Sequence, residues 1–145
     1  MLYFHESPNK SATNHRTKAP QITENCIFLW LLDTFGLFFE DMVVRDLRVY
    51  AEALDGGLYH YRDSNGLECH TVLHRRNGSY ALLEVKLGGE DHINAGAASL
   101  LELAENIDTD KMPAPSFMAV IIGVGKYAYQ RKDGVYVIPI GCLKD

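Results

Sequence analysis

The chain has 145 residues, of which 47% are hydrophobic and 23% charged, and its net charge is −5 with neutral histidines. This composition and length are typical of one globular domain rather than two. They exclude the strongly basic balance of a general nucleic-acid coat protein. Three widely spaced cysteines, Cys26, Cys69 and Cys142, form neither a disulfide framework nor a CxxC zinc knuckle, which predicts a reducing compartment.

The N-terminal third has no recognisable targeting signal. Residues 1–6 lack the basic and apolar regions of a secretory peptide. The longest apolar run, CIFLWLL over 26–32, is far shorter than the roughly 20 residues that cross a bilayer. We therefore expect a cytoplasmic protein without membrane contact. Residues 5–25 are polar and lack apolar periodicity, so we expect them to be solvated. We expect the apolar run over 26–32 to dock on the domain or to contact a partner. The chain is therefore divided into an N-terminal tail with a short apolar segment over 1–33 and a domain over 34–145.

The hydrophobic periodicity beyond the tail predicts alternating helices and strands. Asp33 or Thr34 can cap the first helix, and Gly56-Gly57 can end it. Asn-Gly pairs at 65–66 and 77–78 are typical of hairpin turns. The predicted elements are a helix over 34–54, strands over 58–63, 67–75 and 79–87, a helix over 91–107, a strand over 117–124 and a hairpin of 127–130 with 135–140. This order predicts an α/β domain with a mixed sheet flanked by two helices and a C-terminal hairpin.

The third predicted strand carries the most informative pattern. Glu84 and Lys86 are two residues apart, so they share one face of an otherwise apolar strand. A salt-bridged or solvated sheet edge would give the same pattern. The preceding strand presents Glu68, His70, Val72 and His74 on one face. A three-residue loop with a left-handed Gly78 would place position 70 opposite position 84, whereas a two-residue turn would pair it with Val85.

Under the three-residue register, Glu68, His70, Glu84 and Lys86 converge. Glu40 falls inside the edge of the apolar sector of the first helix, so it can lean toward them. Carboxylates hold a hard Mg²⁺ ion, and a lysine stabilises the charge that develops on a phosphate. The group therefore fits metal-assisted phosphodiester cleavage, with Glu84 and Lys86 catalytic and Glu40, Glu68, His70 and Glu84 as metal ligands.

The motifs GLFFE (36–40), YHYRD (59–63), ECH (68–70), LEVK (83–86) and VIPI (137–140) carry a family resemblance. The chain resembles the PD-(D/E)XK nuclease-like superfamily and, more narrowly, an uncharacterised domain at the C-terminus of predicted bacterial and archaeal AAA-type ATPases. The resemblance covers residue 34 to the end. It implies a restriction-endonuclease-like core, a divalent metal such as Mg²⁺, and an ATPase chain or nucleic acid as partner.

Two departures from the family pattern direct the functional expectation. Where the family has Glu-x-Asp, this chain has Glu68-Cys69-His70, and imidazole is a poor Mg²⁺ ligand. The segment 123–127, GVGKY, lacks the upstream Gly and the Ser/Thr of a phosphate-binding loop, so we expect no nucleotide cofactor. Arg131 and Lys132 lie in a turn, where we expect them to be solvated. The sequence favours a non-catalytic or degenerate nuclease-fold binding domain of an ATPase system. The alternative is a metal-dependent nuclease that tolerates His70.

Overall fold

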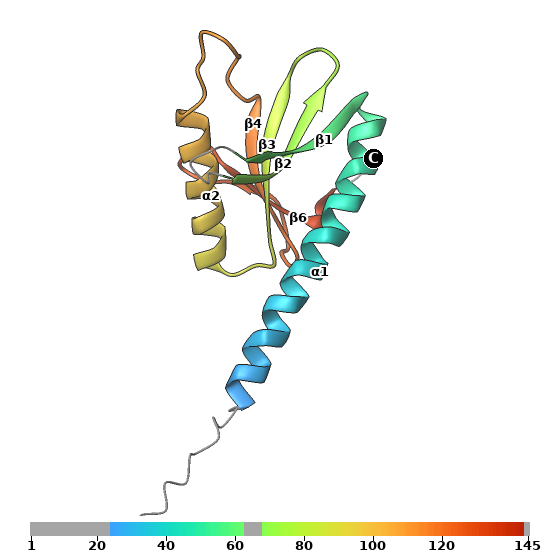
Figure 1. Ribbon diagram of the computed structural model, residues 1–145, viewed down its shortest axis with the longest axis vertical. Helices are drawn as coiled ribbons and strands as arrows, with labels where there is room; N and C mark the ends of the chain where they lie inside the picture. The colour runs from blue at the N-terminus through green and yellow to red at the C-terminus, as the bar shows by residue number, and fades with distance from the viewer. Residues whose placement is uncertain (1–23, 63–67, 144–145) are drawn as a thin grey trace, which may run out of the picture.

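The computed structural model describes residues 24–62 and 68–143, which form two helices and a six-stranded sheet (Figure 1). In chain order the elements are α1 (Glu24–Ala53), β1 (Gly56–Arg62), β2 (Glu68–Arg75), β3 (Tyr80–Lys86), α2 (Glu90–Glu105), β4 (Phe117–Ile122), β5 (Tyr129–Gln130), β6 (Tyr136–Pro139) and a 3₁₀ turn (Ile140–Cys142).

The strands lie in the order β1-β2-β3-β4-β6-β5. β1, β2 and β3 are antiparallel neighbours, β3, β4 and β6 are parallel neighbours, and β5 pairs antiparallel with β6 at the edge. The predicted α/β fold is therefore confirmed, with its mixed sheet, its α-β-β-β-α-β order and its terminal hairpin.

Each helix covers one face of the sheet. Successive strand residues point to opposite faces, so Leu83 and Val85 of β3 face α1, whereas Leu82 faces α2. The α1 side of the core consists of Phe39, Val43, Leu47, Ala51, Leu73, Ala81, Leu83, Val85, Ala119 and Ile121. The α2 side consists of Cys69, Tyr80, Leu82, Ala97, Leu100, Leu103, Val120, Ile122, Val135 and Val137. The sheet is thus buried on both faces, which explains why β3 is apolar along nearly its whole length.

Helix α1 begins well before the predicted residue 34. The apolar run over 26–32 continues the helix, so Thr34 lies inside it rather than at its start. Among the α1 side chains that the structure describes, Phe39 is the first that is buried. The N-terminal half of the helix accordingly extends beyond the sheet (Figure 1). Within the described residues, neither helix combines the length and the apolarity that crossing a bilayer requires.

The turn from α1 into β1 uses a different residue from the predicted glycine stop. Asp55 takes a left-handed backbone conformation with φ of 54°, and the N–H of Arg76 donates to its carbonyl at 3.1 Å. Gly56 instead begins β1, where a Cβ atom would lie 2.7 Å from the carbonyl oxygen of His74. This glycine permits close approach of two strands, and Asp55 reverses the chain.

Candidate functional site

The loop between β2 and β3 has the predicted three-residue geometry. Gly78 is left-handed, with φ of 85°, and the N–H of Arg75 donates to the carbonyl of Ser79 at 2.8 Å. The ladder pairs Thr71 with Leu83. The ladder ends at this pair, one residue short of position 70, so the pairing of position 70 with position 84 stays a prediction. The two-residue turn that would pair position 70 with Val85 is excluded.

A bulge interrupts β2 next to position 70. The ladder with β1 steps from Tyr59↔Val72 to Tyr61↔Cys69, so β2 advances three residues while β1 advances two. Consequently Cys69 packs on the α2 side, although Thr71 lines a cavity on the α1 side. Cys69 and Val72 therefore both face α2, so β2 does not alternate strictly between these two positions, because an extra residue breaks the pattern.

The side chains of Glu68 and His70 lie outside the described part of the structure. Their backbone belongs to β2, and their predicted role as metal ligands stays a prediction. Cys69, which lies between them in the sequence, has a nearly fully buried thiol. It donates at 3.5 Å to the carbonyl oxygens of Thr71 and Leu83, and burial raises its pKa above the ordinary value. A protonated, buried thiol of this kind packs like an apolar group.

Glu84 and Lys86 share the face of β3 that α2 covers. Their side chains form an ion pair with 2.9 Å between Nζ and Oε1, and they are 6% and 24% exposed respectively. A Cβ atom at Gly96 of α2 would lie 3.2 Å from Cγ of Glu84 and 3.5 Å from Cγ of Lys86. The glycine therefore allows α2 to close over the ion pair.

Glu40 lies on the other side of the sheet. It is half-buried and faces the strands, as its helical phase predicts, but α1 covers the face to which Leu83 and Val85 point. There it lines a cavity of about 290 Å³ together with Arg48, Thr71 and Val85. The expected approach of Glu40 to Glu84 or Lys86 is wrong, because helix phase determines that a residue faces the sheet but not which sheet face the helix covers.

The sequence did not indicate this cavity, which is built by α1, β1, β2 and β3. Its lining includes the acids Glu40 and Asp41 and the guanidinium of Arg48. At its floor the hydroxyl of Thr71 is buried and has no hydrogen-bond partner. A threonine in a strand is ordinary, so no local signal distinguishes this position from a packing residue.

The described side chains do not fit a divalent metal ion. They contain no group of three His, Cys, Asp or Glu residues that could hold one. In addition, one oxygen of Glu84 is engaged by an ammonium group, and Glu40 lies on the opposite face. Hard cations in proteins need several oxygen ligands that converge on one point. The described residues show no such convergence.

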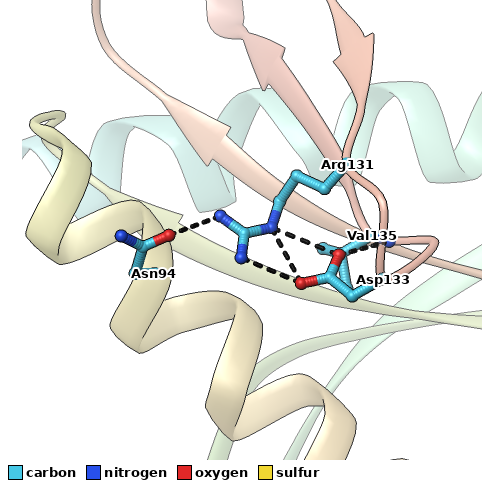
Figure 2. Close-up of polar contacts among 4 residues, drawn as sticks. All are labelled: Asn94, Arg131, Asp133 and Val135. Carbon is cyan, nitrogen blue, oxygen red and sulfur yellow. Dashed lines mark hydrogen bonds and ion pairs between the residues drawn. The ribbon is translucent and has the colours of Figure 1, made fainter.

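The turn between β5 and β6 is held by an ion-pair network rather than being solvated as expected. Arg131 contacts the carboxylate of Asp133 with two nitrogens, Nε at 3.0 Å and Nη2 at 2.8 Å, and donates from Nη1 to the amide oxygen of Asn94 on α2 at 2.6 Å (Figure 2). The N–H of Val135 also donates to Asp133. The guanidinium lowers the pKa of Asp133. The network ties the terminal hairpin to the second helix.

The segment after β4 has a packing explanation for its glycines. A Cβ atom at Gly123 would lie 2.9 Å from the carbonyl oxygen of Leu87 and 3.1 Å from the ring of Phe39. At Gly125 it would lie 2.5 Å from Cγ of Pro139. Both glycines therefore serve close chain packing. Packing therefore explains the spacing of these glycines before Lys126 without a bound nucleotide.

Comparison with protein families gives one match. Residues 35–143, well over half of the chain, match the family described as a domain of unknown function, DUF4143. The chain therefore belongs to this family. The comparison with curated proteins and the comparison with solved structures each gave no match.

Proposed function

We propose that this DUF4143 chain is a non-catalytic binding domain on a nuclease-like scaffold that serves an AAA-type ATPase system. The observation that carries the proposal is the closed Glu84–Lys86 ion pair beneath Gly96. In a metal-dependent nuclease the carboxylate must reach a metal and the lysine must reach a phosphate. Here each group neutralises the other, and the Glu84 side chain is nearly inaccessible.

The remaining members of the predicted constellation support the same conclusion. Glu40 lies on the opposite sheet face, so it cannot complete a ligand set with Glu84. Position 70 holds His where the family pattern has Asp, and imidazole is a weak Mg²⁺ ligand. Loss of ligand positioning alone lowers a reaction rate by orders of magnitude.

The association with an ATPase rests on the resemblance in the family motifs. The segment 123–127 lacks the residues of a phosphate-binding loop and packing explains its glycines, so we assign nucleotide hydrolysis to a separate ATPase chain or domain. An ATPase encoded beside this chain and expressed with it is expected to co-purify with the domain. Failure of every such neighbour to bind, with both proteins folded, would refute the ATPase association.

Catalysis is tested with four proteins: the unmodified chain, His70→Asp, His70→Asp with Lys86→Ala, and His74→Asp as a control on the same strand. Each is incubated with single- and double-stranded DNA and with RNA, in Mg²⁺ and in Mn²⁺. We expect no metal-dependent cleavage by the unmodified chain or the His74 control.

The outcomes separate the two functions. If His70→Asp cleaves nucleic acid and the added Lys86→Ala abolishes that cleavage, the domain is a degenerate nuclease. The Glu84–Lys86 ion pair must then open once the acid is restored. Inertness of all four proteins supports a pure binding domain. Cleavage by the unmodified chain that Glu84→Ala abolishes would overturn the proposal and establish the alternative, a metal-dependent nuclease.

A further inference from the structure

An apolar stripe runs along the side of α1 that faces away from the sheet; it consists of Leu31, Phe35, Phe38, Met42 and Val49. These five side chains, here called the outer stripe, are 42% to 69% exposed. At about 100° per residue they fall on one side of the helix, well around from the buried ridge that begins at Phe39. No described part of this chain covers them.

The spacing within the outer stripe is that of a helix that packs on another helix. Its members follow at intervals of four, three, four and seven residues, which is the alternating pattern of a coiled-coil seam with one place taken by a different residue. That residue is Arg45, whose side chain is exposed and, among the described residues, pairs with its neighbour Asp46 at 2.9 Å. The first half of the stripe lies on the part of α1 that extends beyond the sheet (Figure 1).

We propose that the outer stripe of one chain is covered by the outer stripe of a second copy, with the two α1 helices antiparallel. Two aromatic rings and three aliphatic side chains at these exposures leave roughly 600 Å² of apolar surface on each helix. A stable interface buries about 800 Å² on each partner. The outer stripe supplies most of this area.

Arg45 determines the direction of the pairing. In a parallel pair, Arg45 would meet Arg45 of the second copy within the seam, which places like charges together. In an antiparallel pair centred near residue 40, Arg45 lies over Phe35 of the second copy, where a guanidinium gains a cation–π contact. The same arrangement sets Phe38 against Met42, a favourable sulfur–aromatic contact, and Leu31 against Val49. A two-fold axis relates the copies, so each contact occurs twice.

The first experiment measures the mass of the full chain in solution by sedimentation velocity over a wide micromolar range. We expect a dimer that dissociates on dilution. Phe38→Glu should raise the dissociation constant at least about thirtyfold, because it places a charge at the centre of the seam. Leu37→Glu is the matched control: Leu37 is 66% exposed against 69% for Phe38, but it lies off the outer stripe, so its variant should remain dimeric.

A second experiment tests direction by oxidative cross-linking in a background of Cys26→Ser and Cys142→Ser. Chains with Leu31→Cys, mixed with chains that carry Val49→Cys, should form a disulfide-linked dimer. Leu31→Cys alone should not cross-link to itself. A monomer at every concentration, as expected if an ATPase covers the stripe instead, would overturn the proposal. So would a dimer that Phe38→Glu leaves intact, or self-linking of Leu31→Cys.

Discussion

The ammonium of Lys86 lies 2.9 Å from the carboxylate of Glu84 on the face of β3 that α2 covers. A charge removed from water costs several kcal/mol unless an opposite charge compensates it. Each side chain therefore makes the burial of the other tolerable. Gly96 completes the arrangement, because a Cβ atom there would lie only 3.2 Å from Cγ of Glu84 and the glycine leaves that space to the pair.

The first prediction concerns the mutual dependence of these two charges. Lys86→Met removes the ammonium that neutralises a buried carboxylate, so it should lower the free energy of unfolding by about 2 to 3 kcal/mol. The double variant Glu84→Gln with Lys86→Met should be more stable than Lys86→Met alone, since no buried charge is left. Urea denaturation of the unmodified chain, Glu84→Gln, Lys86→Met and the double variant gives the coupling energy. Additive effects would show that the two side chains do not depend on each other.

The second prediction concerns the buried hydroxyl of Thr71. This hydroxyl has no hydrogen-bond partner in the folded protein, yet it loses its water on folding. Valine has nearly the same shape and suits a strand, so Thr71→Val should stabilise the protein by about 1 kcal/mol. Thr71→Ser, which keeps the hydroxyl and removes a methyl group, should destabilise it. A loss of stability in Thr71→Val would mean that a bound water or ligand satisfies the hydroxyl in the cavity.

Local turn chemistry made the β2–β3 hairpin predictable. The Arg76-Asn77-Gly78 sequence specifies a left-handed third residue, and this fixes the register in which β2 pairs with β3. The bulge in β2 carries no Gly or Pro signal. It depends on how β2 fits two neighbours at once, which a single strand pattern does not contain.

Two predictions about α1 are wrong, and in both cases residues outside the local pattern determine the outcome. Thr34 suits a helix start, but the apolar residues before it continue the helix, and a cap preference of about 1 kcal/mol does not stop it. Glu40 faces the sheet as predicted, but the two helices cover opposite faces. That assignment arises from the β3–α2–β4 connection, so no periodicity within α1 could reveal it.

The third prediction concerns pH and the Arg131–Asp133 ion pair. The guanidinium and the hydrogen bonds lower the pKa of Asp133 below its ordinary value of 3.8. At acidic pH the carboxylate of Asp133 is therefore protonated more readily in the unfolded chain than in the folded protein. The stabilisation that the ion pair contributes is fully present above pH 3.8 and is lost as the pH falls through the pKa of Asp133 in the folded protein.

Asp133→Asn keeps an oxygen for the N–H of Val135 but removes the charge. It should cost about 1 kcal/mol at pH 7 and nearly nothing well below the native pKa. Urea midpoints measured across this range for both proteins check the difference. Asn94→Ala is the control, since it removes a neutral contact of Arg131 and should cost the same at every pH. A pH-independent cost of Asp133→Asn would exclude the ion pair as its origin.

The fourth prediction concerns the reactivity of the two cysteines whose environments are described. Cys69 is buried and Cys142 is exposed. Burial, together with the charge of Glu84, raises the pKa of the Cys69 thiol, so both access and thiolate content are low at neutral pH. In a Cys26→Ser background, a thiol reagent should label Cys142 at once and Cys69 only at the rate of local or global opening. Adding urea to the unfolding midpoint should bring the two rates together. Labelling of Cys69 as fast as Cys142 in the native protein would mean that β2 opens at the bulge, and the closed Glu84–Lys86 face would then be accessible to substrate as well.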